Sequence, residues 1–326
     1  METVELRPMS LGELLDHTFS LNRKNFWVFV GIMAIPASFG IPMNYLVLAS
    51  QGDTLSAGRS PSVPSPGLIL GFVAGYFVFV ALMMFVYSIA VAAATFAVSE
   101  SYLGRKSTVR GSYGKIRGKF WRLIGVVVNI FIRCLGILIG VMSVAVGLAI
   151  GIAAAIGVLA AGSGGRALMA AGVFLLVFLA YIGGIALVVY FALRYAVSIP
   201  ALLLENLGVF ASIRRSVQLT RGRRGHIFLA LLLATIIGYV GVIVFQGPLL
   251  AVTMITVIRN GHVPAWLALL SSVFGAVGGA ITGPISMIVL VLCYYDTRIR
   301  KEAFDLQFMM ASLDSPSPAA GTVSPA

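Results

Sequence analysis

Residues 200–228 read PALLLENLGVFASIRRSVQLTRGRRGHIF, and they join an apolar segment that closes on Glu205 to a new apolar segment that starts before Phe228. Between the two segments, apolar side chains recur at helical spacing among arginines: Val209, Phe210, Ile213 and Val217. We interpret this stretch as a short amphipathic helix at a membrane surface, and we expect related units elsewhere in the chain.

Composition places the chain in a membrane. Of its 326 residues, 59% are hydrophobic and only 10% are charged, and the mean hydropathy is +1.00, which excludes a soluble globular domain. Each apolar segment reaches the ~20 residues that cross a bilayer as a helix; the six are 26–48, 68–98, 123–160, 167–204, 226–258 and 264–295. The predicted fold is therefore all-α, a polytopic bundle of about six transmembrane helices with cytoplasmic amphipathic interfacial helices.

Basic residues predict the orientation. Most of the 23 Lys and Arg residues lie before the first segment, between segments two and three, between four and five, or after six. By the positive-inside rule, we expect both termini to lie in the cytoplasm. The net charge of +12 then indicates contact with anionic lipid head groups rather than nucleic acid. The interfacial basic residues are Lys115, Arg117, Lys119, Arg214, Arg215, Arg221, Arg223 and Arg224.

Three regions follow from this pattern. Residues 1–25 contain a capping box at Ser10 and Glu13, and we expect an amphipathic helix that lies in the interface and turns into the bilayer near Asn25; the alternative is an ordinary helix packed on the bundle. Residues 26–310 form the transmembrane domain, with a mobile loop at 51–67 and a break or kink at Pro36 and Pro42. Residues 311–326 are expected to be disordered.

Acidic residues mark an internal repeat. Glu100 precedes Trp121 by 21 residues, and Glu205 precedes His226 by the same distance. Segment six also ends on an acid, Asp296, before further basic residues. We expect a three-fold repeat of an amphipathic helix followed by a helical hairpin. The alternative, that loops of membrane proteins are generally basic, explains the charge but leaves the spacing unexplained.

Two arginines fall within apolar segments. Arg133 lies 29 residues before Gly162 and Arg194 lies 29 residues after Gly165, so a hairpin that turns between these glycines puts both at matching depth. We expect the two side chains to snorkel towards the cytoplasmic head groups. The alternative is a cavity for an anionic head group or substrate, with Glu205 or Asp296 as counter-charge. Small residues that favour close helix packing recur at Gly136, Gly140, Gly147 and Gly151.

No catalytic, metal or cofactor residues are identified, and we expect no cofactor. The predicted topology separates His262 from His17 and His226, and Cys134 and Cys293 lie in a reducing compartment. Zinc-protease and phosphate-loop motifs do not occur in the sequence. We therefore expect a protein that is not an enzyme.

Three phrases carry a resemblance to a known family. They are the run from Leu6 to Asp16, the run from Pro200 through Gly222, and the run from Tyr294 to Asp305. Together they resemble the bacterial family named glycerophosphoryl diester phosphodiesterase membrane domain, over nearly the whole chain. In that family the hydrolase is a separate soluble barrel, and its His-Arg-Gly start does not occur here. The resemblance therefore implies a membrane protein without that activity, and no site residue is carried over.

The favoured function is a non-catalytic scaffold or accessory factor in a lipid or envelope process, with unidentified membrane protein partners. A transporter with a cavity near Arg133 and Arg194 is the alternative, and a lipid-active enzyme ranks third. The candidate head-group site consists of Arg133, Arg194, Glu205 and Asp296.

Overall fold

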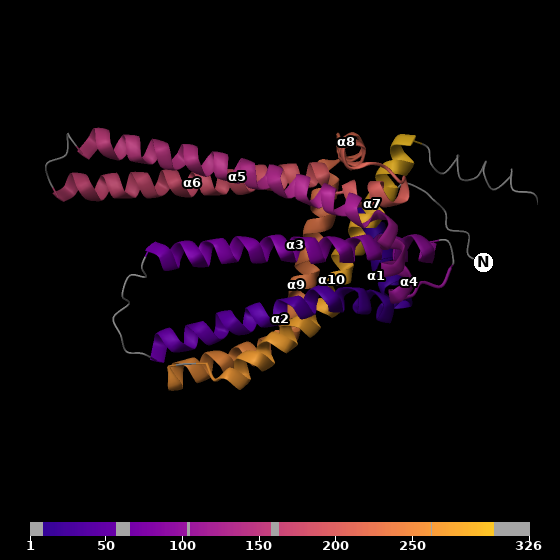
Figure 1. Ribbon diagram of the computed structural model, residues 1–326, viewed down its shortest axis with the longest axis horizontal. Helices are drawn as coiled ribbons and strands as arrows, with labels where there is room; N and C mark the ends of the chain where they lie inside the picture. Colours follow the sequence, from indigo (N-terminus) through magenta and orange to yellow (C-terminus); the bar gives the residue numbers. More distant parts are fainter. Residues whose placement is uncertain (1–8, 57–65, 103–104, 158–162, 262, 303–326) are drawn as a thin grey trace, which may run out of the picture. The chain divides into compact units, whose positions relative to one another are not determined.

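The computed structural model describes residues 9–56, 66–102, 105–157, 163–261 and 263–302 (Figure 1). Every regular element in this part of the chain is helical. The α-helices are α1 (Leu11–Lys24), α2 (Phe26–Ser56), α3 (Pro66–Tyr102), α4 (Val109–Ile116), α5 (Phe120–Gly157), α6 (Ser163–Tyr195), α7 (Ser198–Leu204), α8 (Val209–Thr220), α9 (Arg224–Asn260) and α10 (Ala265–Glu302), and a 3-10 turn, Arg117–Lys119, joins α4 to α5.

The helices confirm the predicted fold class. Five spans of this part are long and apolar enough to cross a membrane: Ala74–Ser101, Val109–Gly151, Ala171–Leu204, Arg224–Asn260 and Ala265–Glu302. A sixth is obtained if Leu11–Lys24 and Phe26–Pro42 count as one bent span. These two helices meet at an angle of 91°, so the predicted turn of the chain near Asn25 is confirmed. The protein is a multi-pass, all-α membrane protein.

The structure corrects several predicted boundaries. α2 continues to Ser56, so the first part of the loop predicted at 51–67 is helical. α2 continues through Pro36 and Pro42, so the predicted break does not occur there, while the alternative of a kink stays a prediction. Outside the described residues lie 57–65, the tail 311–326, Gly162, His262 and the first residues of the N-terminal motif.

The segment predicted at 167–204 is not one helix. It divides into α6 and α7 at Ala196 and Val197, where the Ser198 hydroxyl donates a hydrogen bond to the Tyr195 carbonyl at 2.7 Å. Pro200 lies in the first turn of α7, where its missing N–H costs little, and a proline disfavours a helix that continues through the preceding residues. The segment predicted at 123–160, by contrast, forms the continuous α5 of 38 residues, about 57 Å long.

The chain divides into two compact units, of which the first comprises residues 1–69, 89–118 and 225–326. Within it α10 packs on α1 and α2, and glycines of α10 allow close approach to its neighbours. Gly283 lies against Met33 of α2, while Gly275 and Gly278 lie against Gln246 and Phe245 of α9. These contacts bury most of the second half of α10 and leave α1 with Leu14 and Thr18 buried. α1 is therefore packed on α10 through its fourth and eighth residues.

The second unit comprises residues 70–88 and 119–224. Its core is the hairpin of α5 and α6, which lie side by side in Figure 1, with α7 and α8 packed at the end where α6 stops. The two helices of the hairpin are in contact at Gly184 of α6, which lies opposite Leu138 and Val141 of α5. The prediction that the small-residue stripe of α5 makes the close contact is wrong. A Cβ atom at Gly136, Gly140, Gly147 or Gly151 would meet no described atom within 4 Å, because α6 passes along another face of α5.

Candidate functional site: the short helices and the arginines beside them

The three short helices α1, α4 and α8 are buried at equivalent positions. The fourth and eighth residues of each are buried: Leu14 and Thr18, Ser112 and Ile116, Ser212 and Ser216. Positions four residues apart lie on one face of a helix, so each short helix presents the same face to its neighbours. In α8 this face includes Ile213, as the apolar spacing predicts, but Phe210 is 68% exposed and lies outside it.

An acidic residue at the end of α3 or directly after α7 is bonded to the seventh residue of the helix that follows, α4 or α8. Lys115 of α4 forms an ion pair with Glu100 of α3. Arg215 of α8 donates from Nε to the two carboxylate oxygens of Glu205, at 3.1 and 2.8 Å. The acids identified by their spacing in the sequence therefore hold α4 and α8 by the same device.

A glycine in the second turn of α2 and of α5 packs against the first residue of a short helix, α4 and α8 respectively. A Cβ atom at Gly31 of α2 would lie 2.8 Å from Val109 of α4, and one at Gly125 of α5 would lie 2.9 Å from Val209 of α8. Gly31 and Gly125 are each the sixth residue of their helix. Only a residue without a side chain permits this approach, so both units contain the same contact between a long and a short helix.

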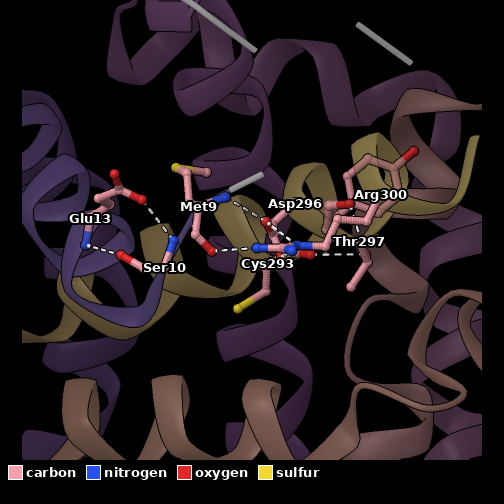
Figure 2. Close-up of polar contacts among 8 residues, drawn as sticks. Met9, Ser10, Glu13, Cys293, Asp296, Thr297 and Arg300 are labelled. Atoms are coloured by element: carbon pink, nitrogen blue, oxygen red, sulfur yellow. Dashed lines mark hydrogen bonds and ion pairs between the residues drawn. The ribbon is translucent and has the colours of Figure 1, made fainter. Parts of the chain in front are cut away.

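The third acid, Asp296, holds the N-terminal segment. Its carboxylate is fully buried and accepts hydrogen bonds from the Met9 backbone N–H at 2.9 Å and from Arg300 Nε at 2.9 and 3.1 Å. Arg300 also donates from Nη2 to the Met9 carbonyl at 2.7 Å, which closes a ring of polar contacts (Figure 2). The Ser10–Glu13 capping box follows directly, with hydrogen bonds in both directions. Asp296 therefore fixes the residue that precedes α1.

The turn after α7 positions Glu205. Asn206 adopts a left-handed backbone conformation with φ of 51°, and the N–H of Leu207 bonds to the Leu202 carbonyl at 3.2 Å. This is the Schellman pattern of helix termination, in which asparagine tolerates the left-handed position better than most residues. Lys119 Nζ donates to the Leu203 carbonyl at 2.7 Å and so satisfies another carbonyl of this helix end.

Arg133 of α5 contacts Tyr195 of α6 across the hairpin. Because Gly184 lies opposite Leu138 and Val141, the backbone of Arg133 lies level with residues 189–192 of the antiparallel α6. Its Nη1 nevertheless donates to the Tyr195 hydroxyl at 3.2 Å, and its Cζ lies 5.6 Å from the centre of that ring. Arg133 is therefore bonded across the hairpin to α6, and its snorkelling towards the head groups stays a prediction.

The backbone carbonyl of Arg194 is hydrogen-bonded to two side chains of α8. Its carbonyl accepts hydrogen bonds from the hydroxyls of Ser216 at 3.0 Å and Thr220 at 3.3 Å, while its guanidinium lies 5.9 Å from the Phe191 ring centre. Arg133 lies level with residues 189–192, so the two arginines are within about one helical turn of each other in depth.

The four predicted site residues do not form one cluster of contacts. Arg133, Arg194 and Glu205 belong to the second unit, and Asp296 belongs to the first. Glu205 is bonded to Arg215 and Asp296 to Arg300. We expected Glu205 or Asp296 to act as the counter-charge of Arg133 and Arg194. The contacts of the described residues do not support this expectation.

The predicted basic residues have different roles. Lys115 and Arg215 form the ion pairs described above, and Lys119 satisfies a helix end. Arg117, Arg214 and Arg221 are exposed, and Arg223 is half-buried. Arg224, the first residue of α9, donates to the Tyr190 hydroxyl, and its Cζ lies 4.8 Å from that ring centre.

Sequence reasoning missed the aromatic partners of the arginines and the backbone of Met9. Tyr190 and Tyr195 are five residues apart and follow no helical period, so no pattern distinguishes them from other aromatic residues of the apolar segment. Among the described residues, no group of three or more His, Cys, Asp or Glu side chains is arranged to hold a metal ion.

Comparison with known proteins identifies one related family. Residues 166–309 match the family model described as the membrane domain of glycerophosphoryl diester phosphodiesterase. The predicted resemblance is confirmed over these residues, whereas its predicted extent over nearly the whole chain, including the phrase from Leu6 to Asp16, stays a prediction. The matched region contains α7, α8 and the Asp296 end of α10, and so two of the three phrases from which the resemblance was predicted. Neither the curated proteins nor the solved structures contain a match to the chain.

Proposed function

We propose that this protein is a non-catalytic scaffold or accessory factor of the bacterial inner membrane, and that its short helices, each held within its own unit, contact partners. The observation that carries this proposal is the shared use of the three acids. Glu100, Glu205 and Asp296 all bond to a cation beside a short helix and hold that helix in place. Carboxylates used in this way stabilise a surface rather than serve as acids or bases.

Two tryptophans mark the starts of α2 and α5 as ends of membrane-spanning helices. Trp27 and Trp121 are each the second residue of their helix, and they are 80% and 81% exposed. Each packs edge-to-face on the phenylalanine before it, with ring centres 5.4 and 5.8 Å apart. Tryptophans with exposed rings at the ends of apolar helices are typical of the membrane interface. Together with the basic residues of α4 and α8, they favour cytoplasmic termini.

Site-directed labelling tests the orientation. In a variant without Cys134 and Cys293, Arg117→Cys and Arg259→Cys place one exposed thiol at each predicted face. A membrane-impermeant maleimide should label the Arg259→Cys variant in intact cells and the Arg117→Cys variant only after permeabilisation. The opposite pattern would overturn the proposed orientation.

Cross-linking and purification from the native membrane test the scaffold role. We expect stoichiometric membrane protein partners with the native chain and a loss of partners with Glu205→Gln, which removes the ion pair between Glu205 and Arg215 of α8. The Asp16→Asn variant is the matched control, because Asp16 is an exposed acid on α1. Equal recovery of partners with both variants would contradict the scaffold role. Flux of a solute in proteoliposomes that depends on Arg194 would instead favour the transporter alternative.

A further inference from the structure

Three arginines of the second unit lie on an aromatic ladder at the end of α6. The ring centres of Tyr190 and Phe191 are 5.5 Å apart, and those of Phe191 and Tyr195 are 6.3 Å apart. Each ring carries one guanidinium: Arg224 on Tyr190, Arg194 on Phe191 and Arg133 on Tyr195. The rings fix the arginines through cation–π contacts and leave most of their N–H donors available.

These three cations are not neutralised within the described part of the chain. No described carboxylate lies within 4.0 Å of Arg133, Arg194 or Arg224, whereas Glu100, Glu205 and Asp296 each pair with other cations. Three uncompensated guanidinium groups beside apolar helices repel one another and are costly to desolvate. The cluster therefore favours the binding of an anion.

Residues of the cluster have buried polar atoms without partners among the described residues. Arg194 Nε and Arg224 Nε are buried and form no hydrogen bond with any residue that the structure describes. Asn129 Oδ1 is also buried without a partner, and Asn129 precedes Arg133 by one turn on the same face of α5. Buried polar groups are nearly always satisfied, so three such atoms around one cluster point to a ligand with both charge and hydrogen-bonding atoms.

The cluster occupies less than half of the circumference of α6. At 100° per residue, Tyr190 and Arg194 lie 40° apart, and Tyr195 lies a further 100° round the helix. Around α6, Arg194 therefore lies between Tyr190 and Tyr195, the two residues whose rings contact Arg224 and Arg133. We propose that this cluster, with Arg194 at its centre and Arg133 and Arg224 beside it, binds a phosphate group, because the guanidinium fork matches phosphate oxygens. This site is independent of the scaffold role and of any partner protein.

The phosphate can belong to an anionic phospholipid or to a soluble phosphate, and two titrations distinguish these sources. The full chain, purified in an uncharged detergent, is titrated with short-chain phosphatidylglycerol and, separately, with inorganic phosphate. Native mass spectrometry measures binding of the lipid, and calorimetry measures binding of inorganic phosphate. Binding of either probe at the cluster supports the proposal and identifies the source; binding of neither to the native protein overturns it.

Variants locate the binding at the cluster. Arg194→Gln should weaken binding of the active probe by about tenfold, which corresponds to the loss of one charge-assisted hydrogen bond. Arg194→Lys keeps the charge but lacks the fork, and it should weaken binding less. Arg214→Gln is the matched control, because it removes one exposed cation from the same unit, and we expect a change of less than about twofold.

Arg133→Gln provides a second route if Arg194→Gln fails to fold, because Arg133 is exposed and its loss opens no core. It should also weaken binding of the active probe several-fold. Native affinity in both cluster variants would overturn the proposal. An equal loss in Arg214→Gln would show that binding follows the general surface charge, which would also overturn it.

Discussion

The buried carboxylate of Asp296 accepts a hydrogen bond from the backbone N–H of Met9 at 2.9 Å, across 287 positions of the chain. Arg300 bonds to the same carboxylate and to the carbonyl of the same methionine. Both backbone groups of Met9 are therefore satisfied by the end of α10, and the N-terminal segment is held before α1 begins.

Replacement of Asp296 by Asn should destabilise the protein markedly. The change leaves Arg300 half-buried without its carboxylate, and breaking a buried pair in this way costs about 3 kcal/mol. Thermal unfolding in detergent measures the loss. The matched control is Asp16→Asn on the exposed side of α1, which should change stability by less than about 0.5 kcal/mol. Equal midpoints for the two variants would show that the pair does not hold the segment.

The contact between Gly125 and Val209 predicts a steric effect that can be reversed. The Gly125→Ala variant forces a methyl group to within about 2.9 Å of the Val209 side chain, so we expect a loss of about 1–3 kcal/mol. Val209→Ala in the same chain should recover most of the loss. Gly136→Ala meets no described atom and should stabilise α5 by up to about 1 kcal/mol. Additive losses in the double variant would contradict the proposed contact.

The ion pair between Glu205 and Arg215 can be measured by a double-mutant cycle. Both side chains are partly buried, at 14% and 23% exposure, so the coupling should reach about 1 kcal/mol and exceed that of most surface pairs. The variants are Glu205→Gln, Arg215→Gln and the combination, with unfolding followed by circular dichroism. A coupling of zero would mean that this ion pair does not hold α8, and that its other contacts, such as the Ser216 and Thr220 hydroxyls, do so.

Asn206 should tolerate glycine better than valine. Its φ of 51° lies in the left-handed region, which glycine adopts without strain and a β-branched residue adopts at a cost of about 2 kcal/mol. Unfolding midpoints of Asn206→Gly and Asn206→Val report this difference directly. If the two variants are equally stable, the turn after α7 does not depend on the left-handed position.

Part of the internal repeat could be predicted from sequence spacing. The spacing of Glu100 and Glu205 predicted related units, and in both cases the acid bonds to the seventh residue of the following short helix. This was predictable because helix position and chain separation are related by a fixed period. The third unit could not be predicted in the same way, because Asp296 pairs with Arg300 on its own helix and with the backbone of Met9 at the other end of the chain.

The candidate arginine site was predicted only in part. Arg133 and Arg194 stand out because charges are rare in apolar segments. In the sequence, Arg224 was only one of several interfacial basic residues. The structure assigns it to the cluster because it donates a hydrogen bond to the Tyr190 hydroxyl. Backbone and ring contacts of this kind carry no sequence signature, because they depend on which side chains meet when two helices pack.

The sequence by itself determined that this is an all-α, multi-pass membrane protein whose chain bends at Asn25, because hydropathy, capping residues and helical period are local properties. Only the tertiary structure decided which glycines receive a neighbour, where the segment after Gly165 breaks, and which partner each acid takes. Those outcomes depend on packing between residues that lie far apart in the chain, where a difference of one helix face changes every contact.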